Sequence, residues 1–346
     1  MKRDFNVNDL WQNAQVKYEH QDYAGAIEDY TQAIALDTKN ANIYYARGVA
    51  RQRMQDYAGA IQDYTKAIAL NLQAVDIYYN RGIARHLMQD YRGAIEDYTK
   101  AIALNSIDAD FYNNRGLSWY QLGDKSKALA DYTQAITLNP QDAQLYYNRA
   151  YIYNESAAYS QAIADYNCVI KLTPENTEAY YYRGNNRYYL GDKSGAIEDL
   201  SRAIELSPDY TEAYYNRGYI KSELGEYPSA IADYDLALKL NPNYTDAYYN
   251  RGNTQYQLGN LAAAIEDYGR TIALDPNYID AYNNRGTVFS KQGDLQTALE
   301  DYNRALSLDN KYIRAYENRA YIRSQLGDLT GAEADRQQVQ RLKELN

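Results

Sequence analysis

The segment that decides the fold is TEAYYNRGYIKSELGEYPSAIADYDLALKLNPNY, which occupies residues 211–244. Its second half places apolar side chains at the i, i+1, i+4, i+7 and i+8 spacing of an amphipathic helix, at Ala230, Ile231, Tyr234, Ala237 and Leu238. The first half carries the markers of an earlier helix. In the best-formed copies of this segment, Leu-Gly-Asp separates the two, because glycine can end one helix and aspartate can cap the next. The segment therefore predicts a helical hairpin.

The hairpin pattern recurs along the whole chain at one constant step, the step that separates Arg47 from Arg81. An arginine followed by a very small residue stands at Arg47, Arg81, Arg115, Arg149, Arg183, Arg217, Arg251, Arg285 and Arg319. An aspartate, in most copies followed by tyrosine, stands at Asp29, Asp63, Asp97, Asp131, Asp165, Asp199, Asp233, Asp267, Asp301 and Asp335. The predicted repeats lie near 7–40, 41–74, 75–108, 109–142, 143–176, 177–210, 211–244, 245–278, 279–312 and 313–346. We expect one solenoid over residues 1–346, with the last repeat as a polar cap.

These markers resemble the tetratricopeptide repeat family, and the resemblance covers essentially all 346 residues. It implies an all-α fold in which stacked hairpins form a right-handed superhelix, with the first helix of each hairpin lining a concave groove. Individual repeats depart from the pattern. In the fifth, Asn154-Glu155-Ser156-Ala157-Ala158 replaces the Gly-Asp turn, which predicts a soft joint there.

The repeated arginine shares the packed side of its helix with the tyrosine three residues earlier. A buried guanidinium needs a partner, and the repeated aspartate is the acid that recurs with it, so we expect an arginine–aspartate lattice. The first repeat has Asp29 but Asn13 in the arginine position. This substitution suggests that Asp29 reaches Arg47 in the following repeat, but the sequence leaves open which aspartate pairs with which arginine.

The opposite side of the first helix is the predicted groove. Two residues before the arginine it carries tyrosine in most repeats, among them Tyr79, Tyr147, Tyr181, Tyr215 and Tyr249. Five residues before the arginine it carries acids, at Asp76, Asp110, Glu178, Glu212, Asp246 and Asp280. These acids favour a basic ligand, but they also suit a helix start, where negative charge is stabilising.

A row of asparagines stands immediately before the arginine, at Asn80, Asn114, Asn148, Asn216, Asn250, Asn284 and Asn318. Asparagine offers a donor and an acceptor, so the row could hold the backbone of an extended peptide. It is similar to the asparagine ladder of the sugar transferase that places N-acetylglucosamine on Ser and Thr. The alternative is that the asparagines tie neighbouring helices together.

The charge of the chain narrows the classes of partner. A net charge of -10 opposes nucleic acid and anionic membrane surfaces, and no stretch has the length of a membrane span. The two-carboxylate clamp of heat-shock co-chaperones needs lysines on the groove, where this chain has tyrosine, asparagine and acid. A single cysteine, Cys168, fits a reducing compartment, so we expect a cytoplasmic protein. Cys168 falls where other repeats carry Lys or Arg, which predicts exposure.

Motifs for catalysis, metals or cofactors do not emerge from the sequence. No nucleophile has a base in a recognisable motif, no glycine-rich phosphate loop opens a helix, and no His or Cys pair has ligand spacing. His86 falls on the predicted groove as a polar lining residue. We therefore expect no enzyme, no metal and no cofactor.

Two hypotheses for function remain. The first is a protein-interaction scaffold or adaptor that binds an extended, neutral to basic peptide segment in the Tyr/Asn-lined groove. The second is self-assembly into dimers or filaments through the end repeats. Gln337, Gln340 and Lys343 make the last helix polar, which speaks against stacking at that end. Phe5, Leu10 and Trp11 could cover the first hairpin or contact a partner.

Overall fold

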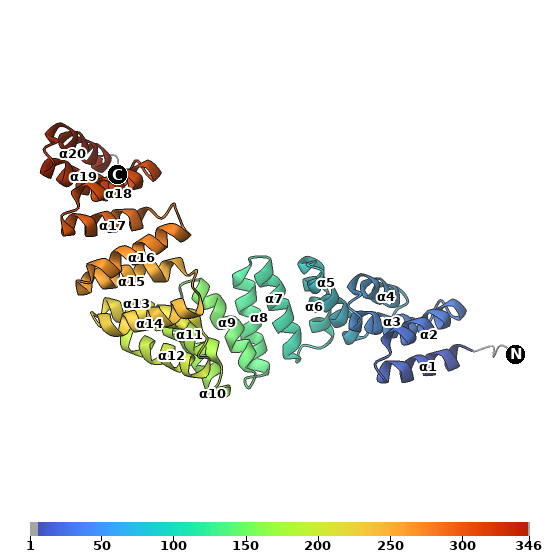
Figure 1. Ribbon diagram of the computed structural model, residues 1–346. Helices are drawn as coiled ribbons and strands as arrows, with labels where there is room; N and C mark the ends of the chain where they lie inside the picture. Colours follow the sequence, from blue (N-terminus) through green and yellow to red (C-terminus); the bar gives the residue numbers. More distant parts are fainter. Residues whose placement is uncertain (1–5, 345–346) are drawn as a thin grey trace. The chain divides into compact units, whose positions relative to one another are not determined.

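The computed structural model describes residues 6–344, so Phe5 lies outside the described part of the chain. Within that part the protein consists of twenty α-helices and no strand, which confirms the all-α solenoid of hairpins (Figure 1). Contacts divide the chain into two compact units, Met1–Pro174 and Glu175–Asn346. The boundary falls at the end of the fifth predicted repeat.

The first unit contains five hairpins. Its helices are α1 (Val7–Glu19), α2 (Tyr23–Leu36), α3 (Ala41–Arg53), α4 (Tyr57–Ala69), α5 (Val75–Leu87), α6 (Tyr91–Leu104), α7 (Ala109–Gln121), α8 (Lys125–Leu138), α9 (Ala143–Glu155) and α10 (Tyr159–Leu172). Each helix from α2 to α9 packs mainly against the one before it and the one after it along the chain.

The second unit repeats the same order. Its helices are α11 (Thr177–Tyr189), α12 (Lys193–Leu206), α13 (Thr211–Glu223), α14 (Tyr227–Leu240), α15 (Thr245–Leu258), α16 (Leu261–Leu274), α17 (Ile279–Gln292), α18 (Leu295–Leu308), α19 (Ile313–Gln325) and α20 (Leu329–Glu344). The last helix buries Ala332, Asp335 and Leu342 and exposes Gln337, Gln340 and Lys343.

The turn inside each hairpin has one geometry, although its sequence varies. Gly191 adopts φ +86°, and the next residue, Asp192, caps α12 by accepting a bond from the Gly195 N–H at 2.9 Å. In the fifth hairpin Ala157 occupies the same left-handed region at φ 54°, and Ala158 provides no side-chain cap for α10. The sequence departure is therefore accommodated without losing the turn, but at a position that disfavours a Cβ atom.

Close helix approach explains the small residue after each arginine. A Cβ atom added to Gly82 would lie 2.7 Å from the ring of Tyr98 on the second helix of the same hairpin. The recurrent alanines, such as Ala94, are completely buried. These contacts bring the two helices close enough for their polar side chains to meet.

The arginine–aspartate lattice exists, but its pairing differs from the one suggested by the first repeat. Arg47 binds Asp63, sixteen residues later in the same hairpin, with Nε donating to Oδ2 at 2.9 Å and Nη2 to Oδ1 at 2.7 Å. All nine repeated arginines make this two-bond contact within their own hairpin. Asp29 instead pairs with Lys17 at 2.7 Å, so the inference that it reaches Arg47 was wrong. Lys17 lies one helical turn after Asn13, at the position of the first repeat that corresponds to Arg51 in the second. Arg51 likewise pairs with the aspartate of its own hairpin, Asp63.

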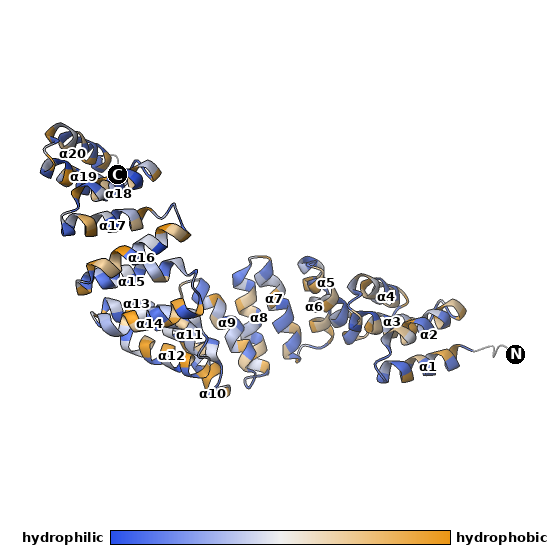
Figure 2. Ribbon diagram, in the orientation of Figure 1, coloured by the Kyte–Doolittle hydropathy of each residue, from blue (hydrophilic) through white to orange (hydrophobic). Residues whose placement is uncertain are grey.

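Hydrophilic and hydrophobic residues alternate along the helices (Figure 2). Of the helices in residues 6–344, none is both long enough and apolar enough to cross a bilayer.

Candidate functional site

The first helices of successive hairpins meet along one side of each unit. Within the first unit α3 contacts α5 and α5 contacts α7, and within the second unit the series runs from α11 to α19. This contact brings together the residues five, two and one before the repeated arginine of neighbouring hairpins. We call the surface formed by these three positions the ladder face.

Every asparagine that stands immediately before a repeated arginine is bonded to the preceding hairpin. Its Nδ2 donates to the residue two before the arginine of that hairpin. Five asparagines donate to tyrosine hydroxyls at 2.8–3.2 Å: Asn80 to Tyr45, Asn114 to Tyr79, Asn216 to Tyr181, Asn250 to Tyr215 and Asn284 to Tyr249. Two donate to asparagine Oδ1 atoms at 2.9–3.1 Å: Asn148 to Asn113 and Asn318 to Asn283. The asparagines thus tie helices together, and their role in binding stays a prediction.

The asparagine–tyrosine pairs retain unused hydrogen-bonding capacity. In residues 6–344 no donor lies within bonding distance of the Oδ1 atoms of Asn80, Asn114 or Asn250. The tyrosine hydroxyl that accepts the asparagine bond also has a proton of its own to donate. Each of these three pairs can therefore present one acceptor and one donor side by side, which is what a peptide group requires.

The tyrosine rings of the ladder face are held by neighbouring aromatic rings. The Tyr215 ring lies 4.7 Å from that of Tyr244, centroid to centroid, and Tyr249 lies 4.9 Å from Tyr278. Burial, with a further contribution from Asp246, raises the pKa of Tyr215 to about 12, so its hydroxyl is protonated and able to donate at neutral pH.

The other tyrosines of the ladder face have comparable ring contacts. Tyr181 pairs with Tyr210 at 4.8 Å, Tyr79 packs against Phe111 at 4.9 Å, and Tyr147 meets Tyr166 edge-on at 5.9 Å.

Four further tyrosines of the second unit were not predicted as part of the site: Tyr210, Tyr244, Tyr278 and Tyr312. They stand just before each first helix from α13 onward at the constant step of the repeat, so periodicity alone could have identified them. Tyr278 donates to Asp246 Oδ1 at 3.2 Å, and Tyr312 donates to Asp280.

The predicted acids all lie in the first turn of a first helix. Asp76, Asp110, Glu178, Glu212 and Asp246 are exposed, and Asp280 is partly buried and lies 3.9 Å from Arg314. Desolvation and the neighbouring Asp108 and Asp142 raise the pKa of Asp110. The position of the acids suits both a helix-stabilising role and an attraction for cations.

His86 and Cys168 have structural surroundings. His86 Nδ1 lies 2.9 Å from the hydroxyl of the buried Ser118, which itself donates to the Asn114 carbonyl. Burial lowers the pKa of His86. Cys168 is partly buried rather than exposed, because its helix places it near Tyr146. Across residues 6–344 no cluster of three His, Cys, Asp or Glu side chains could hold a metal ion.

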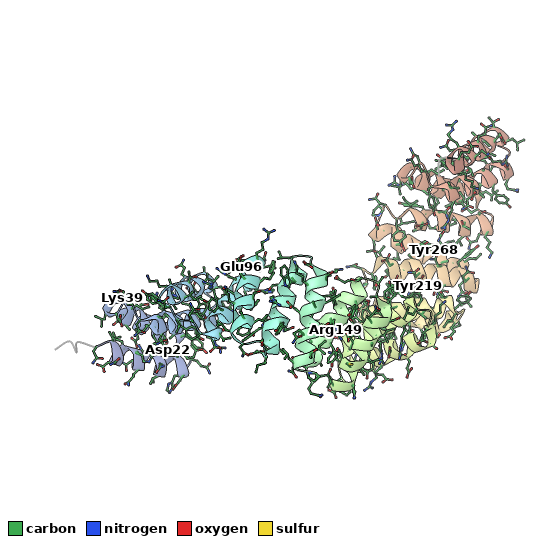
Figure 3. All side chains as sticks on the ribbon, turned by 180° about the vertical axis from the view of Figure 1, so that it is seen from behind. Asp22, Lys39, Glu96, Arg149, Tyr219 and Tyr268 are labelled. Carbon is green, nitrogen blue, oxygen red and sulfur yellow. The ribbon has the colours of Figure 1, made fainter. Side chains whose placement is uncertain are left out.

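Figure 3 shows side chains along both units, including Arg149 of the lattice and Tyr268, which packs under Tyr249 of the ladder face. Twenty helices paired into hairpins of nearly constant length define a solenoid of tandem helical repeats in the described part of the chain. Family models identify the kind of repeat. The model described as TPR repeat matches residues 14–55, 53–89, 184–225, 219–259 and 252–293, and two described as tetratricopeptide repeat match 75–107, 109–142, 279–312 and 131–164. The chain belongs to the tetratricopeptide repeat family.

Several solved structures are similar to the chain. A tetratricopeptide repeat protein from Parabacteroides merdae is 21% identical, with 72% of this chain and 98% of that chain covered and a TM-score of 0.52. The C-terminal part of a repeat protein from Cytophaga hutchinsonii is 16% identical, with coverage of 79% and 98% and a TM-score of 0.54. YrrB, described as having an unusual peptide-binding site, is 28% identical over 53% of this chain and 95% of its own, with a TM-score of 0.49. No curated protein matches the sequence. Family membership supports a general role as a protein-interaction scaffold.

Proposed function

We propose that the ladder face binds the backbone of an extended, neutral to basic peptide segment, and that the chain works as an adaptor through this contact. The observation that carries the proposal is the asparagine–tyrosine pair, such as Asn250 with Tyr215, bonded at 2.8 Å. Its free Oδ1 suits a peptide N–H, and its hydroxyl suits a peptide C=O.

The contacts of one asparagine–tyrosine pair are weak, but several pairs in a row can together bind a peptide. Each added hydrogen bond stabilises a complex by about 1 kcal/mol net, so a segment that crosses several pairs gains a few kcal/mol from its backbone alone. Ordering the peptide costs a similar amount, which leaves side-chain contacts to decide between partners and favours micromolar affinity.

Charge selects among candidate segments. The net charge of -10 and the exposed acids at the start of several first helices, among them α13 and α15, attract basic residues and repel acidic ones. The same charge opposes nucleic acid, and the single cysteine fits a reducing compartment. We accordingly place the adaptor role in the cytoplasm and expect neither a cofactor nor catalysis.

The test compares variants that remove single hydroxyls. Partners are captured from native lysate, and a synthetic segment of a captured partner is then titrated into the pure protein. Tyr215→Phe with Tyr249→Phe removes two donors of the ladder face and should weaken binding about tenfold or more. Tyr248→Phe is the matched control, because its ring lies near Arg251 on the other side of α15.

The folded fraction of each variant is checked by thermal unfolding, since the asparagine bonds also join hairpins. Equal affinity of the double variant and the control would refute the ladder face as the binding surface. Self-association through the end repeats is the competing hypothesis, and light scattering over a concentration series distinguishes it: a monomer at every concentration excludes assembly.

A further inference from the structure

The first three hairpins contain two adjoining pockets that include part of the ladder face and extend beyond it. One, of about 400 Å³, is lined by residues that include Trp11 and Tyr18 of α1, together with Tyr45 and Val49 of α3. The other, of about 420 Å³, shares Tyr45 and Val49, reaches Asn80 of α5 and extends to Arg53 at the end of α3. The shared residues make the pockets neighbours along one helix.

The first pocket is suited to a bulky apolar side chain. Its lining is largely aromatic and aliphatic, and the Trp11 and Tyr30 rings lie 5.5 Å apart, which fixes one wall. The amides of Gln15 and Asn42 stand among these rings and can bond the backbone of an entering chain. Such a mixture of apolar walls and a few polar groups is typical of ligand pockets.

The second pocket contains an arginine without a carboxylate partner. Arg53 Nε donates to the Tyr18 hydroxyl at 3.3 Å, and in residues 6–344 no carboxylate oxygen lies within 4.0 Å of its guanidinium. By contrast, the other arginines on the first helices of this unit pair with aspartates: Arg47, Arg51, Arg81, Arg85, Arg115 and Arg149.

Arg53 is also no part of the repeat pattern. The matching positions in the neighbouring hairpins are Glu19, Leu87 and Gln121. The bond to Tyr18 orients the guanidinium, and its two terminal nitrogens have no hydrogen-bond acceptor among residues 6–344. A guanidinium with two parallel N–H groups matches the two oxygens of a carboxylate.

We propose that these pockets together form an anchor site for an extended segment with an apolar side chain followed by an acidic one. The apolar side chain enters between Trp11 and Tyr45, and the carboxylate pairs with Arg53. In an extended chain, residues i and i+2 point the same way and lie about 7 Å apart, which suits neighbouring pockets on one helix. The motif is therefore apolar-x-acid.

The anchor site differs in charge preference from the ladder face. Asp76, on the next first helix, lies near the Tyr45 hydroxyl and is the first acid of that face. Arg53 therefore attracts a carboxylate, whereas the acids of the ladder face, which begin at Asp76, repel one. The anchor site shares Tyr45 with the ladder face of the first unit, so variants in the second unit, such as Tyr215→Phe, are the ones that test the two sites separately.

The experiment uses the full chain and three labelled twelve-residue peptides in a neutral Gly/Ser background. Their central residues are Leu-Ser-Glu, Leu-Ser-Gln and Ala-Ser-Glu, both ends are blocked, and affinities are measured by fluorescence anisotropy. We expect Leu-Ser-Glu to bind about tenfold more tightly than Leu-Ser-Gln, since a charge-assisted bond is about twice as strong as a neutral one. Ala-Ser-Glu should also bind several-fold more weakly, because it leaves the first pocket empty.

The variants assign the preference to the arginine. Arg53→Gln should reduce the advantage of Leu-Ser-Glu to within about twofold, and because Arg53 is exposed its loss should leave the fold intact. Arg92→Gln is the control, as an exposed arginine of α6 in the same unit. Tyr215→Phe, in the second unit, should leave the affinities for all three peptides unchanged, even if the ladder face binds peptides as proposed.

Three results would overturn the anchor site. The first is equal binding of the Glu and Gln peptides, or a Glu preference that survives in Arg53→Gln. The second is binding only when a peptide has a free C-terminal carboxylate, which would mean that Arg53 recognises the end of a chain and not an acidic side chain. The third is the absence of binding by every peptide up to millimolar concentration.

Discussion

The turn of the fifth hairpin lacks both devices that stabilise the sixth, so restoring them should stabilise that hairpin. Ala157 holds φ 54° where Gly191 stands in the sixth hairpin, and Ala158 stands where Asp192 caps the following helix. The variant Ala157→Gly/Ala158→Asp transplants the sixth turn into the fifth.

The expected gain follows from the two positions separately. Left-handed backbone costs an alanine about 1 kcal/mol, of which glycine recovers roughly half after its own flexibility in the unfolded chain is counted. An aspartate cap in place of alanine adds about 1 kcal/mol. The caps of other hairpins have bonds of 2.8–3.2 Å, so the geometry is available. The sum is roughly 1.5 kcal/mol, or about tenfold in a local opening equilibrium.

Amide hydrogen exchange read by mass spectrometry measures this quantity for each helix. In the wild type, α9 and α10 should exchange faster than the helices of the fourth hairpin, which would support a soft joint at the fifth repeat. In the variant their protection should rise about tenfold. The matched control reverses the change in the sixth hairpin, with Gly191→Ala/Asp192→Ala, and should lower protection in α11 and α12. Unchanged protection in both variants would show that turn chemistry does not limit local stability and would refute the reasoning.

Three further predictions concern the stability of the fold. Asp97→Ala removes the buried carboxylate that the partly buried Arg81 and Arg85 both contact, and it should cost about 3–5 kcal/mol in chemical denaturation, whereas a cost under about 1 kcal/mol would mean that the lattice contributes little to stability. Gly82→Ala places a methyl group against the Tyr98 ring and should cost about 1–3 kcal/mol, with an unchanged melting temperature as the contrary result. Burial raises the pKa of Tyr215 from 10 to about 12, so stability present below pH 10 should decline as the pH rises towards 12. Tyrosinate absorbance and circular dichroism recorded together check this, and titration of all tyrosines near pH 10 without unfolding would contradict it.

Much of the fold could be predicted because each signal was local and repeated ten times. The stripe at Ala230 and Tyr234 defined a helix, and the Gly-Asp turn defined a hairpin. The chemistry of the lattice was also predictable, since a buried arginine requires an acid.

The register of the lattice was not predictable for a reason inherent in periodic sequences. Arg47 stands almost midway along the chain between Asp29 and Asp63, and both spacings recur from repeat to repeat. Pairing within a hairpin and pairing between hairpins therefore leave the same pattern. Only the antiparallel packing of α3 on α4 selects the later aspartate.

The same ambiguity affected the ladder face. The sequence placed Asn250 and Tyr215 on one side of their helices, but it could not show that the amide of one donates to the hydroxyl of the other in the preceding hairpin. The pocket at Arg53 was not predicted for the opposite reason. Arg53 is a single departure from the repeat, and a search for periodicity detects only residues that recur.

Each lattice pair, formed by a repeated arginine and the aspartate sixteen residues later, is confined to its own hairpin, and this has a consequence for how such a chain can change length. A cut through the array between hairpins divides none of these pairs, so each piece keeps its buried charges neutralised. Removing or duplicating one whole repeat should therefore leave no orphaned guanidinium at the new junction, whereas pairing across the junction would have left one at every end. Gene duplication could extend this protein one hairpin at a time. The contacts between hairpins to be rebuilt would be the apolar packing, the asparagine bonds, and the bonds from the repeated arginines to the preceding hairpin, such as Arg47 Nη1 to Thr31 Oγ1 at 3.0 Å.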